Sequence, residues 1–193
     1  MLFNKARARE LMNRAGIDVL VTTSPTNITY MTDYHCWVDA KMKEYMIIPG
    51  ASDGLIQGFA VFALEGPAAL VVNADMVQNA RDCWVRDVHT YGDTRLDNSL
   101  GGAPRTDEER RVQDVFERGE EHATSTDALV RILKDRGLEA ARIGLEKASG
   151  PYAQTIAACL PRASIKDARN LILLTRMVKT EDEIGRLTRA AEI

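Results

Sequence analysis

The side chains best suited to chemistry lie in one short segment, residues 34–41. It combines two aromatic rings, a histidine, an acid and a base, and the candidates for contact with a substrate are His35, Trp37, Asp39 and Lys41. Loops that present such groups on a rigid scaffold often serve recognition. The alternative is that Trp37 packs into the domain and the charged groups face solvent. We name residues 34–41 the candidate recognition loop.

No catalytic residue and no metal ligand is predicted in this chain. The histidines, His35, His89 and His122, are isolated, and none lies in a His-Glu-x-x-His motif. We expect a structural role for His89 and a solvated position for His122, which follows two glutamates. The sequence also lacks a Gly-x-Ser-x-Gly elbow, a Walker loop and a Gly-x-Gly-x-x-Gly helix start. The chain alone is therefore expected to be inactive and to hold no cofactor.

The composition is that of a soluble globular protein, because 45% of the residues are apolar and 27% are charged. A net charge of −3 and a pI near 5.7 provide no basic stripe for nucleic acid or an anionic membrane. The apolar runs are too short for a membrane span, and the first residues lack the apolar region of a signal peptide. Three scattered cysteines indicate reduced thiols. We therefore expect a cytoplasmic protein.

Helical and strand periods alternate along the chain, which predicts an α/β domain with a mixed β-sheet flanked by helices. Helices are predicted at 4–15, 25–31, 75–84, 107–118, 125–136, 151–159 and 168–175. Strands are predicted at 17–21, 44–48, 58–64, 68–72, 85–91, 142–145 and 163–166. Gly-containing turns between the strands from 44 to 72 favour a meander. Residues 92–107, rich in glycine, are predicted to form a loop.

Helix starts have recognisable signals. Ser24 is predicted to cap a helix whose first residue is Pro25, and Asp75 is predicted to cap the helix that follows it. Asp127 lies in a first turn, where a carboxylate is favoured. The charged run at 108–111 is interpreted as a solvated helix face.

The last helix has a strong start and no stop. Thr180 and Glu183 form a capping box, and an apolar stripe follows at Ile184, Leu187 and Ala191. No glycine, asparagine or proline ends the helix before Ile193. A frayed terminal helix is one interpretation. We favour the other, in which this helix leads into a further domain.

Two stretches, read together, resemble the N-terminal domain of the creatinase/prolidase (Xaa-Pro aminopeptidase) superfamily of metallohydrolases. The first contains Arg9, Leu11 and Ala15-Gly16-Ile17-Asp18-Val19-Leu20-Val21, then Ser24-Pro25-x-Asn27-Ile28-x-Tyr30-Met31-Thr32. The second is Arg176-Met177-Val178-Lys179-Thr180-Glu181-Asp182-Glu183-Ile184, and between them Ile143-Gly144-Leu145-Glu146 resembles the family's late strand. In these motifs Gly16 permits a tight turn, and Asn27 is expected to bond local backbone. The family usually has glycine where this chain has Asp33, so the following loop is expected to take a different path.

The resemblance implies a ribonuclease H-like mixed sheet over residues 1–175, with residues 176–193 starting a linker helix to a C-terminal catalytic domain that the chain lacks. That "pita-bread" domain would hold two divalent metal ions (Mn, Co or Zn) for metal-assisted hydrolysis. The chain's partners would be this domain, a second copy in a homodimer, and a peptide or small-molecule substrate. The candidate recognition loop would gate the neighbouring subunit's pocket, with Lys41 near the substrate carboxylate.

A second hypothesis remains open. The chain is then a stand-alone α/β module that binds a small ligand or another protein. The reading frame beyond Ile193 distinguishes the two, because only the first hypothesis requires further residues with metal-binding carboxylates.

Overall fold

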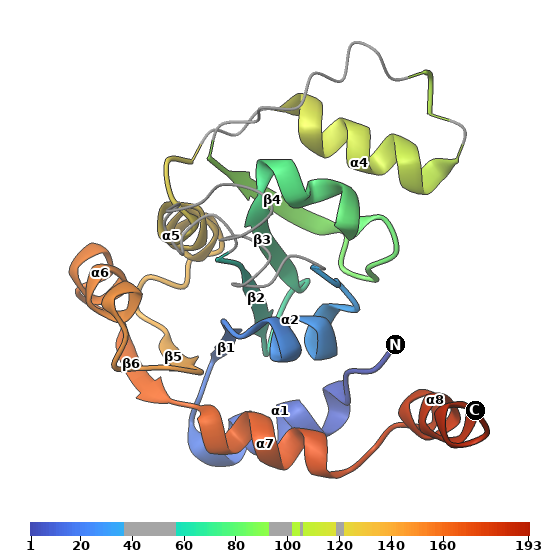
Figure 1. Ribbon diagram of the computed structural model, residues 1–193. Helices are drawn as coiled ribbons and strands as arrows, with labels where there is room; N and C mark the ends of the chain where they lie inside the picture. The colour runs from blue at the N-terminus through green and yellow to red at the C-terminus, as the bar shows by residue number, and fades with distance from the viewer. Residues whose placement is uncertain (37–56, 93–101, 105, 119–121) are drawn as a thin grey trace.

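Strands from both halves of the chain form one mixed sheet. The computed structural model describes residues 1–36, 57–92, 102–104, 106–118 and 122–193. Within those ranges six strands pair in the order β4-β3-β2-β1-β5-β6 (Figure 1). They are β1 (Val19–Thr22), β2 (Phe59–Ala63), β3 (Ala69–Asn73), β4 (Asp87–Tyr91), β5 (Arg142–Leu145) and β6 (Ser164–Asp167). The predicted α/β class and mixed sheet are confirmed.

Strand directions follow the lengths of the connections. β1, β2 and β3 pair antiparallel, which confirms the predicted pairing of the strands at 58–64 and 68–72, with β1 as the other neighbour of β2. β4 runs parallel to β3, β5 runs parallel to β1, and β6 runs parallel to β5. The connections that return parallel strands carry the 3₁₀ helix η3 (Ala74–Ala80) and the α-helix α6 (Pro151–Cys159), since a parallel return requires a crossover. β1 is thus the central junction between the two halves of the chain.

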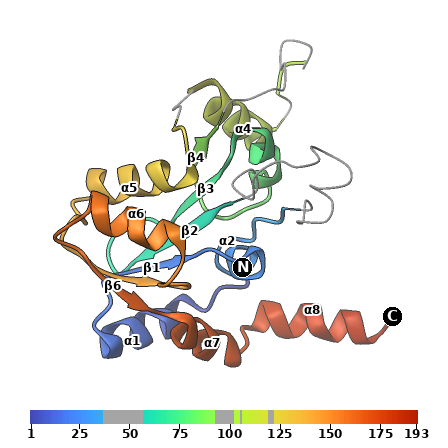
Figure 2. The same cartoon turned by 60° about the vertical axis from the view of Figure 1, so that its left-hand side comes forward.

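Helices cover both faces of the sheet, so the inner strands are buried on both sides. One face packs against α5 (Ser125–Asp135) and α6, and the other against α1 (Lys5–Ala15), α2 (Pro25–Thr32), η3, α4 (Asp107–Arg118) and α7 (Arg169–Met177). Figure 2 shows α5 beside α6 and α1 beside α7 on opposite sides of the sheet. Successive residues of β1 alternate between the two cores: Val19 and Val21 face α5, while Leu20 faces α1. A run of apolar residues in β1 is therefore required rather than an alternating pattern.

The N-terminal helix has both of its ends satisfied locally. Asn4 Oδ1 accepts from the Arg7 backbone N–H, and Gly16 ends α1 in the left-handed conformation at φ 60°. A tight turn into β1 is needed there, as predicted. Arg7 Nε also donates to the carbonyl of Leu174 at 2.8 Å and thereby joins α1 to α7.

Three predictions for the middle of the chain are wrong. Asn73, not Asp75, caps the third helical segment: its Oδ1 accepts from the Asp75 backbone N–H at 2.9 Å. That segment is also a 3₁₀ helix that ends at Ala80, before the predicted residue 84. Arg111 is not simply solvated, because its guanidinium donates to the carbonyls of Ala80, Arg81 and Val85. It thus adds a charged donor to carbonyls at the end of η3 and in the turn after it, two of which also accept from Cys83.

The second half of the chain matches its predicted elements closely. β5 and α6 have the predicted bounds, and α5 begins with a capping box between Thr124 and Asp127. Gly144 in β5 is required by close packing, since a Cβ there would lie 2.9 Å from side-chain atoms of Ile17. The predicted strand at 44–48, and most of the predicted loop at 92–107, lie outside the described residues.

The last helix, α8 (Glu181–Ala191), begins with the predicted capping box between Thr180 and Glu183. None of its residues is buried. Over the described part of the chain, no helix combines the length and the apolar character that a bilayer span needs.

Candidate functional site

The most polar buried arrangement in the domain surrounds the carboxylate of Glu146, directly after β5. Its Oε2 accepts from the backbone N–H groups of Thr23 at 2.7 Å and Ser24 at 2.9 Å. Its Oε1 accepts from Ser24 Oγ at 2.6 Å and from Asn27 Nδ2 at 2.7 Å. Because β5 runs parallel to β1, the carboxyl ends of both strands meet here. The negative charge therefore lies at the N-terminus of α2, where the helix dipole favours it.

Hydrogen bonding, not burial, decides the protonation of Glu146. Burial raises the pKa of this carboxyl, but the bonds from Ser24, Thr23 and Asn27 outweigh it and hold the pKa below its usual value. Both oxygens are already engaged by donors. Within the described ranges, no group of three histidine, cysteine or acidic side chains could hold a metal ion. Glu146 is thus a structural anchor rather than a general base.

Asn27 connects Glu146 to Arg176, near the end of α7. While its Nδ2 donates to Glu146, its Oδ1 accepts from Arg176 Nη1 at 2.9 Å. The expectation that Asn27 bonds local backbone is therefore wrong. Ser24 occupies the predicted N-cap position, but its hydroxyl donates to Glu146 and makes no cap bond. Both side chains therefore bind the distant Glu146 carboxylate instead of nearby backbone groups.

Arg176 is held from a second side by an aromatic ring. Its guanidinium carbon lies 5.7 Å from the centroid of the Tyr30 ring, within reach of a cation–π interaction. Tyr30 is itself buried, and its hydroxyl accepts from the Asn4 backbone N–H at 3.2 Å. The orientation of this guanidinium is thus fixed by residues of β5, α2 and the start of α1. We name Glu146, Asn27 and Arg176 the anchor network.

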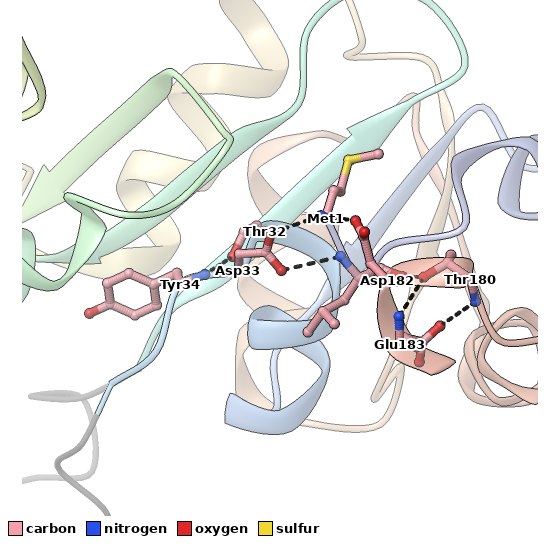
Figure 3. Close-up of polar contacts among 8 residues, drawn as sticks. Met1, Thr32, Asp33, Tyr34, Thr180, Asp182 and Glu183 are labelled. Carbon is pink, nitrogen blue, oxygen red and sulfur yellow. Dashed lines mark hydrogen bonds and ion pairs between the residues drawn. The ribbon is translucent and has the colours of Figure 1, made fainter. Parts of the chain in front are cut away.

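Asp33 has the backbone conformation of the glycine that it replaces. It ends α2 at φ 60° and is the non-glycine residue with positive φ among the described residues. Its carboxylate accepts from the Leu2 backbone N–H at 3.3 Å and lies 3.8 Å from the amino group of Met1, which also pairs with Asp182 (Figure 3). Aspartate tolerates this conformation better than most residues. The predicted change of path concerns the loop after Asp33, most of which lies outside the described residues, and it stays a prediction.

A pocket of about 550 Å³ opens between α2 and α8. Its lining residues combine apolar and cationic side chains with one carboxylate: Leu2, Pro25, Thr26, Thr29, Tyr30, His35, Cys36, Arg176, Lys179, Glu183, Arg186 and Leu187. We name it the α2–α8 pocket.

The structure places only the beginning of the candidate recognition loop. His35 is exposed and lines the α2–α8 pocket, next to the half-buried Cys36. Trp37, Asp39 and Lys41 lie outside the described residues. His89, expected to be structural, lies 2.9 Å from Asp87 within β4.

Large apolar side chains are exposed along α7, the segment after it and α8. Met177 exposes 69% of its surface and Leu187 58%, and the others are Leu173, Leu174, Val178, Ile184 and Ile193. We name this surface the α7–α8 face. Large exposed apolar side chains gathered on consecutive elements are typical of an association surface.

Sequence reasoning missed the central role of Glu146, although one signal pointed to it. An acidic residue that directly follows a buried strand lies at the edge of a sheet where functional and anchoring side chains gather. The motif around Arg176 was noticed, but its contact with Asn27 spans 149 positions and has no local signature.

Comparison with known proteins agrees with this architecture. The family model of the creatinase/prolidase N-terminal domain matches residues 5–178. No curated protein matches the chain in sequence. The prolidase from Pyrococcus horikoshii OT3 aligns over 97% of this chain with a TM-score of 0.54 and 16% identity. A proline dipeptidase from Streptococcus pneumoniae aligns over 92% of this chain and 99% of its own, with a TM-score of 0.57 and 14% identity.

A third structure, the X-Pro aminopeptidase from Thermotoga maritima MSB8, aligns over 94% of this chain with a TM-score of 0.56 and 14% identity. At these identities the likeness establishes the fold. The chain spans 39% of the P. horikoshii protein and 38% of the T. maritima protein, so both contain a large part with no counterpart here.

Proposed function

The chain belongs to the creatinase/prolidase N-terminal domain family, and from this premise we propose that it is the non-catalytic N-terminal domain of an Xaa-Pro peptidase or creatinase-like metal-dependent hydrolase. The α7–α8 face is the observation that carries the proposal. It lies on the last two helices, where a chain of the length seen in the P. horikoshii prolidase would continue. In this proposal the face packs against a C-terminal catalytic domain.

The chemistry of the reaction belongs to that second domain. Two divalent metal ions (Mn, Co or Zn) would be held there, and they would supply activated water for hydrolysis. The residues of this chain instead support the catalytic domain and orient it. The anchor network fixes the end of α7 against α2 and β5 through Arg176, and so sets the direction in which α8 leaves the domain.

We further propose a share in assembly and substrate choice. Two copies would associate as a homodimer, and the candidate recognition loop would reach the pocket of the neighbouring subunit. His35, Trp37, Asp39 and Lys41 remain the candidates for this contact. Support comes from the position of His35, which is exposed directly after α2.

Two experiments test the proposal. The first is to read the coding frame beyond Ile193 and assay its complete product for hydrolysis of an Xaa-Pro dipeptide with added Mn²⁺. Turnover by the complete product, and none by residues 1–193 alone, is expected. A stop codon directly after Ile193 would instead favour the stand-alone module.

The second experiment measures self-association of residues 1–193 by sedimentation velocity. The exposed α7–α8 face should cause association that rises with concentration, and Leu187→Asp should weaken it because a carboxylate opposes burial of that surface. Gly185→Asp, on the same helix but turned away from Ile184 and Leu187 and with open space at its Cβ, is the matched control. Equal association of both variants and the unmodified chain would remove the proposed role of the face.

A further inference from the structure

The α2–α8 pocket has the size and the lining of a small-molecule site. A volume of about 550 Å³ lies within the range of known ligand pockets, about 300–1,000 Å³. Such pockets combine apolar walls with a few fixed polar groups. Here Leu2, Pro25 and Leu187 supply apolar wall, and three of the four charged side chains in the lining are cationic.

Arg176 is the fixed polar group. Asn27 orients its guanidinium by one hydrogen bond, and Asn27 is itself held by the buried carboxylate of Glu146. Tyr30 lies against the guanidinium. One N–H is used in this way, and a guanidinium has further N–H groups in a planar fork that fits a carboxylate. A donor held by a second layer of contacts binds without a large loss of side-chain freedom.

The other charges of the lining also favour an anion. Lys179 and Arg186 are exposed cations, and neither forms an ion pair with a described residue. Lys179 Nζ donates to the Arg176 carbonyl, which draws it toward the same end of the pocket. The single carboxylate in the lining, Glu183, is already engaged by the Thr180 backbone N–H in the capping box.

From these contacts we propose that the α2–α8 pocket binds a small carboxylic acid with an apolar body. The carboxylate binds Arg176 and is supported by Lys179 and Arg186, while the apolar body packs against Leu2 and Leu187. This site lies entirely on residues of this chain and is independent of any hydrolytic activity.

The test is a titration of the unmodified 193-residue chain with three probes, followed by ¹H–¹⁵N NMR. N-acetyl-L-leucine carries both the carboxylate and the apolar body, N-acetyl-L-leucinamide lacks the charge, and acetate lacks the body. The acid should bind about tenfold or more tightly than either analogue. The amide loses a hydrogen bond to a charged group, which is worth about that factor, and acetate loses the burial of the apolar body. Shifts should be largest at the backbone amides of Tyr30 and Leu187.

Variants separate the contribution of the charge from that of folding. Arg186→Gln removes an exposed cation whose influence within the fold is on the exposed Asp182 of the same helix, and should weaken binding of the acid about two- to fivefold. Arg176→Lys keeps a charge but loses the planar fork, and should weaken it by about tenfold. Arg189→Gln, on α8 but outside the lining, is the matched control and should bind like the unmodified chain.

Several results would overturn the proposal. They are equal binding of the acid and its amide, an affinity unchanged by Arg186→Gln, and shifts confined to residues away from α2 and α8. Absence of any shift with all three probes would overturn it as well. None of these results would bear on hydrolysis by the complete product, so the two proposals fail separately.

Discussion

Replacing Glu146 by glutamine keeps the shape of the side chain and removes its charge. All five hydrogen bonds of the carboxylate come from donors, the longest being that from Thr23 Oγ1 at 3.5 Å. An amide NH₂ at either end must therefore face a donor, and a compensating flip of the Asn27 amide would turn its NH₂ toward Arg176. Of the four shorter hydrogen bonds to residue 146, two are therefore lost or reversed in direction. The other two become weaker, because the glutamine oxygen that accepts them carries no charge.

The expected loss follows from those bonds. A hydrogen bond to a charged group is worth about 1.5–3 kcal/mol, and one between neutral groups about 0.5–1.5 kcal/mol. After allowance for the lower cost of burying a neutral side chain, we expect Glu146→Gln to reduce the free energy of unfolding by about 3 kcal/mol. Since a domain of this kind is stable by about 5–15 kcal/mol, the change is easily measured.

Urea unfolding followed by circular dichroism is the assay, with the slope m recorded as a check on two-state behaviour. Glu65→Gln is the matched control, because Glu65 is exposed in the turn between β2 and β3. It should change the free energy of unfolding by less than about 0.5 kcal/mol.

The effect should also depend on pH. Because the pKa of Glu146 is lowered in the folded protein, its contribution is complete above the ordinary glutamate pKa of about 4.3 and is lost as the pH falls through the lower folded value. The difference between the unmodified chain and Glu146→Gln should therefore be constant near neutral pH and shrink in acid. If Glu146→Gln cost no more than Glu65→Gln at pH 7, the anchor network would not have the energetic role given to it.

Three further predictions concern backbone conformation, close packing and a surface ion pair. In urea unfolding, the free energy of unfolding of Asp33→Gly should stay within about 1 kcal/mol of that of the unmodified chain. Asp33→Val should lose about 2 kcal/mol, since a β-branched residue is strained at φ 60°. Equal losses in the two variants would refute the assignment of strain. Gly144→Ala should cost about 1–3 kcal/mol, because the new methyl would lie 2.9 Å from a packed side chain. Gly185→Ala has open space and should instead raise the thermal midpoint slightly, so a reversed ranking of the two alanine variants would contradict the packing argument. The hydrogen bonds from Arg142 lower the pKa of Asp18 to about 2, so the stability that this pair provides should be present above the usual aspartate pKa and lost as the pH falls toward 2. NMR titration of the Asp18 carboxyl measures this pKa, and a midpoint at the usual aspartate value would refute the ion pair.

Local signals predicted the elements where each end is satisfied by neighbours in sequence. Gly16 ends α1, Pro151 begins α6, and the Thr180–Glu183 box begins α8, all within one turn of the residues that they affect. Among these local signals, the choice between neighbouring candidate caps was wrong once. Asn73 supplies the cap expected of Asp75, and this is a shift of only two positions.

In the candidate site, too, the residue types could be recognised from the sequence while their contacts could not. Ser24, Asn27 and Arg176 were recognisable as parts of motifs, but their roles depend on contacts that span 119–149 positions. No periodicity or propensity carries that information, because it arises only when β5 pairs with β1. The motif residues identified the family, while the pairing of the strands determined what they do.

The anchor network also has a consequence for the order in which the domain can fold during synthesis. The carboxylate that satisfies Ser24 is encoded 122 positions later. At about 5–20 residues per second, roughly 6–24 s pass on the ribosome before it is made. Until then the first N–H groups of α2 depend on water, and β1 lacks its parallel neighbour β5. The N-terminal half of this domain therefore reaches its final packing only after residues of the C-terminal half have been synthesised.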